Sequence, residues 1–583
     1  MSKPKLALIP SGYKSGKVYS ILPNDATGDF DFTRQSIGTR VRKDGLIEEA
    51  KTSGSITNLQ IRSEEFDNSA WIKSDISITA NDTLAPNGTN TADAIVEGTG
   101  TGGKIIYDTH TTTTGIYTFS VHIKKEDKRY TAIQVSGTAF GMFNVDLDNG
   151  TGEIVAGSLN ETNIEVLSND WYRISITFSA SSGTLNTTIY LMSGSAYANR
   201  SYTGNGTDKN YVWGAMLSEG ALSDYIKTEG SQETKTVETF TDVPRLDWYN
   251  SNCPSLLLEP QRTNYATNNT SMDTYSNSVF GNNPNPTQTA DYTIAPDGTL
   301  TATRLQTSKT GTNYSLISFP TTSDDGSGGG YYTASVYVKS NTGSSQSIAF
   351  YGANSAPNTR TATTEWSRIQ FTGQRLGNTK YAYLGTINGT DDDIDISVWG
   401  AQIELVDSYP SSLIYTEAST VTRLKDECLN GGDSDLFDIT EGTFFADITP
   451  YDNEGANTTY ILLSDGSTLN RIIFIFYGNL NQVRFFLSSN ASGSTVNYLS
   501  HYQSISFNQK NKLAFTFKKD ELKCYANGSL VHTISSALVP INLESLDFST
   551  SAQNSSFFEG KVHDTRVYDR VLTEAEAIEL TTL

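Results

Sequence analysis

Apolar and polar residues alternate along much of this chain in short runs, with the period of two that half-buried β-strands show. The clearest runs are YTFSVHIK at 117–124, WYRISITF at 171–178, YTASVYVK at 332–339, RIIFIFY at 471–477 and NKLAFTF at 511–517. Turn residues (Gly, Asn and Asp) separate the runs. This pattern predicts an all-β chain built from β-sandwich domains.

Four sequence blocks occur twice in the same order, which indicates an internal repeat. The pairs are LAPNGT (84–89) with IAPDGT (294–299), YTFSVHIK (117–124) with YTASVYVK (332–339), WYRI (171–174) with WSRI (366–369), and VWGAML (212–217) with VWGAQI (398–403). The first block is a turn, because Pro fixes φ and Gly permits positive φ. The others are alternating strands. We therefore expect two related jelly-roll domains, at 58–228 and, in a shorter copy, at 263–416.

The segments around the repeat differ from it. Residues 1–57 hold too little apolar mass for a core of their own, so we expect them to pack on a neighbouring domain or another subunit. Residues 229–262 and 417–432 are expected to be linkers, the first with β structure. Residues 433–583 form a different sandwich, with a tight turn at Asn527-Gly528. A capping box, Thr573 with Glu576, predicts a short final helix.

Several of these patterns resemble known families. Both repeat copies resemble the jelly-roll, carbohydrate-binding-module-like domains of phage virion proteins. The end of the chain, FEGKVHDTRVYDRVLTEAE at 558–576, resembles the closing pattern of concanavalin-like, laminin-G-like lectin domains. The expected fold class is therefore all-β, with tandem β-sandwich (jelly-roll) domains and a C-terminal concanavalin-like sandwich.

The N-terminal segment resembles the N-terminus of structural proteins of tailed phages. The resemblance is carried by KSGKVYSILP (14–23), FTR (32–34) and TRVRKDGLI (39–47), and by the linker motifs VPRLDW (243–248) and CPSLLLEPQR (253–262). It implies a virion component made in the host cytoplasm and anchored to other virion proteins through residues 1–57. Fold analogy adds the expectation of a homotrimer.

These resemblances imply a head or tail fibre, appendage or capsid decoration that mediates adhesion to host-surface or environmental glycans. One alternative is a purely structural decoration or connector protein without a ligand. Another is a polysaccharide-degrading tailspike, which the lack of a long β-helical repeat disfavours. We expect no enzyme activity. The head or tail location, the host, the glycan and the symmetry stay open at this stage.

Composition narrows the partners. The chain has 42 Lys and Arg against 64 Asp and Glu, a net charge of −22, so it repels phosphate backbones and nucleic acid is not an expected partner. It contains no run of about 18 apolar residues, so membrane insertion is not expected, and its N-terminus does not resemble a signal peptide. The three cysteines Cys253, Cys428 and Cys524 give no disulfide framework and no zinc spacing.

Candidate chemistry is sparse. Five scattered histidines show neither metal spacing nor a paired nucleophile, and we expect no catalytic residue. No cofactor is expected except Ca²⁺, for which the acidic run Asp391, Asp392, Asp393 and Asp395 offers clustered oxygens. The competing interpretation of that run is an exposed loop before a strand.

Aromatic rings are the remaining candidates, as platforms for the apolar faces of sugars. Trp71, Tyr202 and Trp248 are predicted to be exposed and are the candidate glycan-binding residues, with packing as the competing interpretation. The second copy lacks a counterpart of Trp71, so a role for that residue would not transfer. The repeated tryptophans are predicted to lie in the core: Trp171, Trp213, Trp366 and Trp399.

Overall fold

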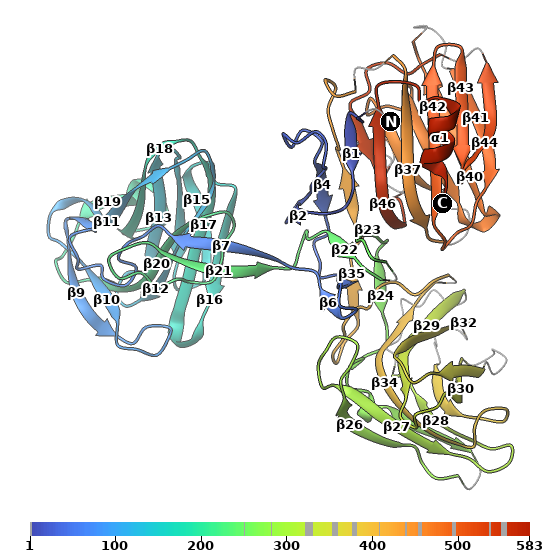
Figure 1. Ribbon diagram of the computed structural model, residues 1–583. Helices are drawn as coiled ribbons and strands as arrows, with labels where there is room; N and C mark the ends of the chain where they lie inside the picture. Colours follow the sequence, from blue (N-terminus) through green and yellow to red (C-terminus); the bar gives the residue numbers. More distant parts are fainter. Residues whose placement is uncertain are drawn as a thin grey trace. The chain divides into compact units, whose positions relative to one another are not determined.

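The computed structural model describes residues 3–249, 251–280, 283–320, 330–352, 359–375, 382–406, 408–437, 440–452, 458–491, 497–535, 538–549 and 557–583. Antiparallel β-strands dominate these ranges, which confirms the predicted fold class (Figure 1). The chain forms two compact units. We call Ser53–Glu238 the inserted unit, and Met1–Thr52 with Thr239–Leu583 the main unit. No helix in the described ranges is long and apolar enough to cross a membrane.

The inserted unit is a two-sheet sandwich. One sheet has the order β16-β17-β12-β20-β10-β9, and the other has the order β15-β14-β13-β18-β11-β19 with β8 beside β11. Their inward residues, such as Phe119, Ile133 and Ile189, form one buried core. The bounds are β8 Ile72–Ser74, β9 Ile76–Thr83, β10 Ala92–Glu97, β11 Thr101–Thr112, β12 Gly115–Lys125, β13 Tyr130–Gly137, β14 Gly141–Asp146, β15 Thr151–Gly157, β16 Glu161–Val166, β17 Trp171–Ala180, β18 Gly183–Met192, β19 Ser201–Thr203 and β20 Lys209–Glu219.

The second repeat copy, in the main unit, has the same topology with fewer strands. Its sheets have the orders β26-β27-β34-β29-β32 and β25-β28-β33-β30-β31. Strand order therefore matches β9-β10-β20-β12-β17 and β8-β11-β18-β13-β14 of the inserted unit. The bounds are β25 Ser276–Phe280, β26 Thr287–Thr293, β27 Ala302–Ser308, β28 Tyr314–Ser318, β29 Tyr331–Ser340, β30 Gln346–Tyr351, β31 Thr359–Ala362, β32 Ser367–Gln374, β33 Tyr383–Thr386 and β34 Asp393–Glu404.

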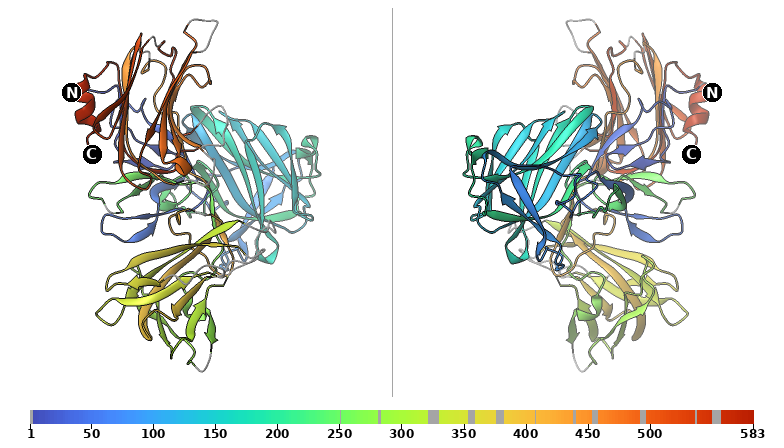
Figure 2. Two further views of the ribbon diagram at one scale, coloured as in Figure 1. Left: turned by 90° about the vertical axis from the view of Figure 1, so that its right-hand side faces the viewer. Right: turned by 90° about the vertical axis from the view of Figure 1, so that its left-hand side faces the viewer.

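The C-terminal sandwich has an eight-stranded sheet, β22-β23-β46-β37-β42-β43-β44 with β1 beside β46, and a five-stranded sheet, β41-β40-β39-β38-β45 (Figures 1 and 2). The predicted final helix α1 (Glu574–Thr581) is confirmed, with Thr573 and Glu576 forming its capping box. The bounds are β1 Leu6–Leu8, β22 Arg245–Asp247, β23 Ser255–Leu258, β37 Gly442–Pro450, β38 Thr458–Ser464, β39 Arg471–Tyr477, β40 Gln482–Ser489, β41 Asn497–Ser504, β42 Asn511–Lys518, β43 Glu521–Ala526, β44 Ser529–Ser535, β45 Ser545–Asp547 and β46 Gly560–Tyr568.

The N-terminal segment and both predicted linker segments contribute to the main unit. β1 and β4 (Phe30–Thr33) bury Leu6, Leu8, Phe30 and Phe32 in the core of the C-terminal sandwich. Small sheets join the remaining pieces of the main unit: β2 (Tyr13–Lys14), β3 (Lys17–Val18) and β4 with β36 (Glu427–Leu429), β5 (Thr39–Val41) with β6 (Ile47–Glu49), and β24 (Arg262–Asn264) with β35 (Val421–Arg423). β7 (Thr52–Asn58) pairs with β21 (Glu233–Thr239) where the chain enters and leaves the inserted unit.

A buried ionic network connects these segments. Arg34 donates to Asp426 at 2.8 Å, Arg245 to Glu259 at 2.6 Å and to Asp426, and Arg423 lies 2.9 Å from Glu259. All five side chains are fully or almost fully buried. Nearby arginines hold the pKa of Glu259 well below its usual range despite its burial. Because removing one partner would leave a buried charge uncompensated, this network fixes how the segments of the main unit meet.

Candidate functional site

Trp71 lies in the core, so the prediction that it is exposed is wrong. Only 1% of the residue is exposed, and its ring packs on Phe66 with 4.8 Å between ring centroids. Its indole N–H donates to the Arg62 carbonyl at 2.7 Å. The loop before β8 folds both aromatic rings under the sandwich, which covers the ring faces that a sugar would need.

Tyr202 and Trp248 are half-buried, and their rings already contact protein cations. The Tyr202 hydroxyl donates to Glu97 at 2.7 Å, and the ammonium groups of Lys104 and Lys128 lie 5.2 and 4.9 Å from its ring centroid. Burial, with the Glu97 carboxylate, raises the pKa of Tyr202. Lys43 lies 5.5 Å from the Trp248 ring. The structure does not bring the three candidates together: Trp71 and Tyr202 belong to the inserted unit and Trp248 to the main unit.

The repeated tryptophans have matching roles in the two copies. Trp171, Trp213 and Trp399 are buried, as predicted, whereas Trp366 is only half-buried. The indole N–H of Trp171 donates to the Leu84 carbonyl at 3.2 Å, and that of Trp366 to the Ile294 carbonyl at 3.1 Å. These side chains therefore hold the repeated Ala-Pro turn against its sheet, a structural role.

The acidic run is distributed among separate partners. Asp392 pairs with Lys309, Asp395 with Arg304, Asp391 accepts from the Ser347 amide at 2.8 Å, and Asp393 accepts from the Ser308 hydroxyl. In the described ranges, no group of three or more His, Cys, Asp or Glu is placed to hold a metal ion. Protein cations thus supply the charge that Ca²⁺ was expected to supply at two of the four aspartates.

The outward face of one sheet in the inserted unit carries three half-buried tyrosines. Tyr130, Tyr190 and Tyr197 pack around Ala132, Met142 and Met192. Strand neighbours such as Ile133 and Ile189 point into the core, so Tyr130 and Tyr190 lie on the opposite face. Tyr197 belongs to the 3-10 turn Tyr197–Arg200 and packs onto that face. We call Tyr130, Tyr190 and Tyr197 the inserted-unit tyrosine face.

Polar groups adjoin this face. A cavity of about 210 Å³ next to Tyr130 is lined by Asn144, Asp146 and Glu153, among others. Asp146 is held by the Arg129 guanidinium through two contacts of 2.9 and 2.7 Å. The guanidinium groups of Arg129 and Arg200 lie 5.1 and 3.7 Å from the ring centroids of Tyr130 and Tyr197, so each of these rings has one side against a protein cation. The face therefore offers the remaining ring surfaces beside hydrogen-bonding groups.

The topologically corresponding sheet of the main unit has a similar face. Tyr314, Tyr351 and Tyr383, the main-unit tyrosine face, pack around Leu316, Ala349 and Ile387. Tyr351 lies directly opposite Tyr383 across β30 and β33, with 5.7 Å between ring centroids. Burial and the neighbouring phenols of Tyr314 and Tyr383 raise the pKa of Tyr351 to about 12. The phenol groups of the face can donate and accept hydrogen bonds while their rings contact apolar surface.

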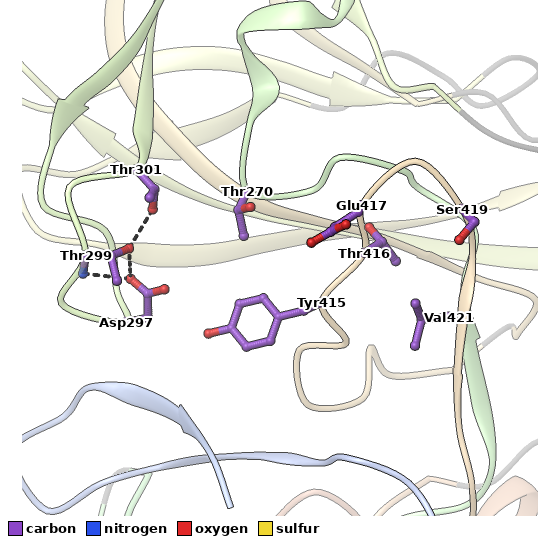
Figure 3. A pocket seen from close by; sticks show the side chains of 9 residues that line it. All are labelled: Thr270, Asp297, Thr299, Thr301, Tyr415, Thr416, Glu417, Ser419 and Val421. Carbon is purple, nitrogen blue, oxygen red and sulfur yellow. Dashed lines mark hydrogen bonds between the residues drawn. The ribbon is translucent and has the colours of Figure 1, made fainter. Parts of the chain in front are cut away.

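A separate cavity of about 510 Å³ lies beside the Ala-Pro-Asp-Gly turn of the main unit, where Tyr415 faces Asp297 and several hydroxyl groups (Figure 3). Asp297 accepts from the Thr299 amide at 2.9 Å and from its hydroxyl at 2.6 Å. Burial raises the pKa of Tyr415, and the Asp297 carboxylate adds to the shift. In the other copy Asn87 makes the same two contacts with Thr89, at 3.0 and 2.6 Å. The hydrogen bonds of Asp297 thus belong to the turn and not to a ligand site.

The sequence-based candidates Trp71, Tyr202 and Trp248 do not include any residue of the two tyrosine faces. One signal was available: the chain has 31 tyrosines, and several occupy the outward phase of alternating strands. Alternation along a single strand does not predict which outward residues become neighbours, because the pairing of strands decides which of them lie side by side.

Comparisons with known proteins bear on the C-terminal sandwich. Residues 433–577 match the family model described as the Concanavalin A-like lectin/glucanases superfamily, which confirms the predicted concanavalin-like domain. No curated protein matches the chain.

Solved structures give distant likenesses. A tandem CBM22 domain of Paenibacillus barcinonensis Xyn10C is 12% identical, covers 61% of this chain and 98% of its own, and has a TM-score of 0.22. The Ruminococcus gnavus IT-sialidase CBM40 bound to α2,3-sialyllactose is 18% identical, covers 25% of this chain and 84% of its own, and has a TM-score of 0.22. Likenesses at these TM-scores carry no argument about this chain.

Proposed function

We propose that this protein is a non-catalytic adhesion protein that binds glycans through the tyrosine faces of its two jelly rolls. One observation carries the proposal: corresponding sheets of the two copies each display three half-buried tyrosines around a floor of small or apolar side chains. Ring faces can stack on the apolar C–H faces of a sugar while phenol groups bind its hydroxyls. The lectin-like C-terminal sandwich is consistent with this function.

Charge indicates the kind of glycan. The net charge of −22 disfavours acidic polysaccharides at long range, so we expect neutral glycans to bind better than acidic ones.

The proposed setting is a virion fibre or appendage, made in the host cytoplasm and assembled as a homo-oligomer with other virion proteins. Its support is the N-terminal and linker sequence pattern at 14–47 and 243–262. Probing purified virions with an antibody against this chain tests the setting: we expect it in the particle. A chain found only in the lysate of infected cells would contradict the proposal.

Glycan-array binding of the full chain tests the function. We expect Tyr351→Ala with Tyr383→Ala to weaken binding at the main-unit face at least tenfold, which corresponds to about 1.4 kcal/mol. Tyr130→Ala with Tyr190→Ala should do the same at the inserted-unit face. Tyr331→Ala is the matched control, because Tyr331 is exposed on β29 of the other sheet. An array without a binder, for a chain that enters virions, would favour a purely structural connector.

A hydrolytic alternative follows from the family description, which includes glucanases. Glycoside hydrolysis ordinarily requires a pair of Asp or Glu side chains that flank the scissile bond, so the histidines of this chain do not bear on it. Incubation with a neutral polysaccharide that the array identifies should leave its chain length unchanged. Shortened products would overturn the non-catalytic assignment.

A further inference from the structure

The main unit contains a cavity of about 530 Å³ that the tyrosine faces do not include. Its wall comes from three regions: residues 39–47 and 247–259, the second jelly roll at Tyr337, 366–370 and 409–413, and the C-terminal sandwich at Tyr451, Asn508 and Lys561. The volume is in the range of ligand pockets, roughly 300–1,000 Å³.

Aromatic rings from five residues form part of this wall. Tyr409 and Tyr451 pack with 4.6 Å between ring centroids, and Trp366, Tyr337 and Tyr249 complete the set. Tyr249 is 57% exposed and lies at the solvent side of the cavity wall. Such a wall can contact several faces of a sugar ring at once.

The exposure of the tryptophan ring at this repeat position is specific to the second copy, where Trp366 is half-buried. Trp171, at the same repeat position, makes the equivalent indole hydrogen bond but is 1% exposed. The turn-holding role therefore does not require an uncovered indole, and the accessible ring of Trp366 is an additional feature of this copy.

The ionic groups of the wall are largely neutralised within the protein. Asp247 pairs with Lys561 at 2.7 Å, and Arg40 pairs with Glu48 at 2.8 Å. Glu259 belongs to the buried network with Arg245 and Arg423. An ionic ligand would therefore find few counter-charges here apart from Arg368, whose two Nη atoms donate to neutral oxygens.

Polar groups suited to hydroxyls remain. Arg368 donates from its two Nη atoms to the Ser411 carbonyl at 2.7 Å and the Ser335 hydroxyl at 2.9 Å. Among the described residues, the Ser367 hydroxyl and the Arg368 Nε are buried without a hydrogen-bond partner. Gln370 and Asn508 add amide groups to the wall.

From these observations we propose that this cavity is a further saccharide site, which takes the end of a neutral oligosaccharide. The ligand class rests on the proposed function, but the site is distinct from both tyrosine faces. Because three regions of the main unit form its wall, a bound sugar would stabilise their association.

Isothermal titration calorimetry of the full chain with maltotriose, cellotriose and chitotriose tests the site. A face variant, Tyr130→Ala, Tyr190→Ala, Tyr351→Ala and Tyr383→Ala combined, removes the proposed surface sites. We expect this variant to retain one binding event per chain with at least one probe. Adding Tyr249→Ala and Gln370→Ala, which lie at the solvent side and leave the core unchanged, should weaken that event at least tenfold.

Trp366→Phe gives a second readout, because it keeps an aromatic ring and removes the indole. It should abolish the ligand-induced change in tryptophan fluorescence that the face variant shows. If the face variant binds none of the sugars that the wild type binds, the cavity is a packing void and this inference fails while the proposed function stands. If the face variant binds like the wild type and the cavity variants do not bind, the tyrosine faces fail and the cavity stands.

Discussion

At the scale of single residues, one asparagine in each copy organises the backbone around it. Asn264 is fully buried, and its amide nitrogen donates to the carbonyls of Ala401 at 3.1 Å and Ile414 at 2.9 Å. Its carbonyl accepts two backbone amides, both at 3.0 Å. Asn58 makes the corresponding four contacts in the first copy. The side chain thus connects the strand that enters each jelly roll to the strand that closes it.

Replacing this asparagine should destabilise each copy separately. Asn264→Ala leaves four buried backbone groups without partners, at about 1–3 kcal/mol for each group that finds no substitute, so we expect a loss of at least about 3 kcal/mol. Urea unfolding of the full chain would measure it. Asn58→Ala should have the same effect on the inserted unit. Asn388→Ala, at an exposed turn, is the control and should change stability by less than about 0.5 kcal/mol.

A buried histidine makes the inserted unit sensitive to acid. His122 packs against Trp213 and Tyr225, and burial lowers its pKa from 6.5 to about 4. Between these values the unfolded chain binds a proton that the folded chain excludes. The contribution of His122 is therefore fully present above pH 6.5 and is lost as the pH falls toward 4, by at most about 3 kcal/mol.

The variant His122→Gln, which does not titrate, tests this contribution. Calorimetric melting of the full chain at several pH values should show a shallower decline between pH 6.5 and 4 for the variant than for the wild type. Identical slopes would mean that His122 does not cause the dependence. His532→Gln is the control, because His532 is exposed on an edge strand.

At the scale of elements, the first strand of the chain completes the last sandwich. β1 pairs with β46, and both Leu6 and Leu8 are fully buried. We expect Leu8→Ala to cost about 2–5 kcal/mol of the stability of the C-terminal sandwich, because it leaves a cavity in a packed core. Lys5→Ala should cost less than about 1 kcal/mol, because Lys5 makes only an exposed ion pair with Asp569 at 3.7 Å. Urea unfolding of the two variants distinguishes these outcomes.

Because β1 pairs with β46, virion anchoring should be tested by a surface substitution and not by deleting the N-terminal segment. Deleting 1–57 would remove buried strands, so lost incorporation would report misfolding as well as lost anchoring. Lys14→Glu on the exposed side of β2 leaves the core intact. If the N-terminal segment anchors the chain, this variant should be depleted from virions at unchanged stability. Normal incorporation would mean that this part of β2 takes no part in anchoring.

Much of the fold was predictable because core residues recur with a period of two. Val121 and Ile123 in one copy, and Val336 and Val338 in the other, are buried as their strands predict. The predictions that failed concern features that depend on contacts between distant segments. Leu6-Ala-Leu8 is too short to signal a strand until β46 lies beside it. The tyrosine faces exist only because strand pairing joins residues such as Tyr351 and Tyr383, and Trp71 looked exposed because its burial depends on the loop fold around Phe66.

At the scale of the whole molecule, the chain enters the inserted unit through β7 and leaves it through β21. β7 and β21 pair, with 2.8 Å between the hydroxyl groups of Thr57 and Thr234. The two ends at which the inserted unit enters and leaves are therefore close in space. Each unit has its own buried core.

Removing residues 53–238 and joining Thr52 to Thr239 through a short Asn-Gly turn should therefore leave the main unit folded. We expect calorimetry to show that one transition of the full chain disappears while the transition of the main unit keeps its midpoint within about 2 °C, since the main unit keeps its own buried core. Binding that depends on Tyr351 and Tyr383 should persist, and binding that depends on Tyr130 and Tyr190 should vanish. A fall of the remaining midpoint by 10 °C or more would show instead that the two units stabilise each other, and the insertion would then be part of one cooperative fold.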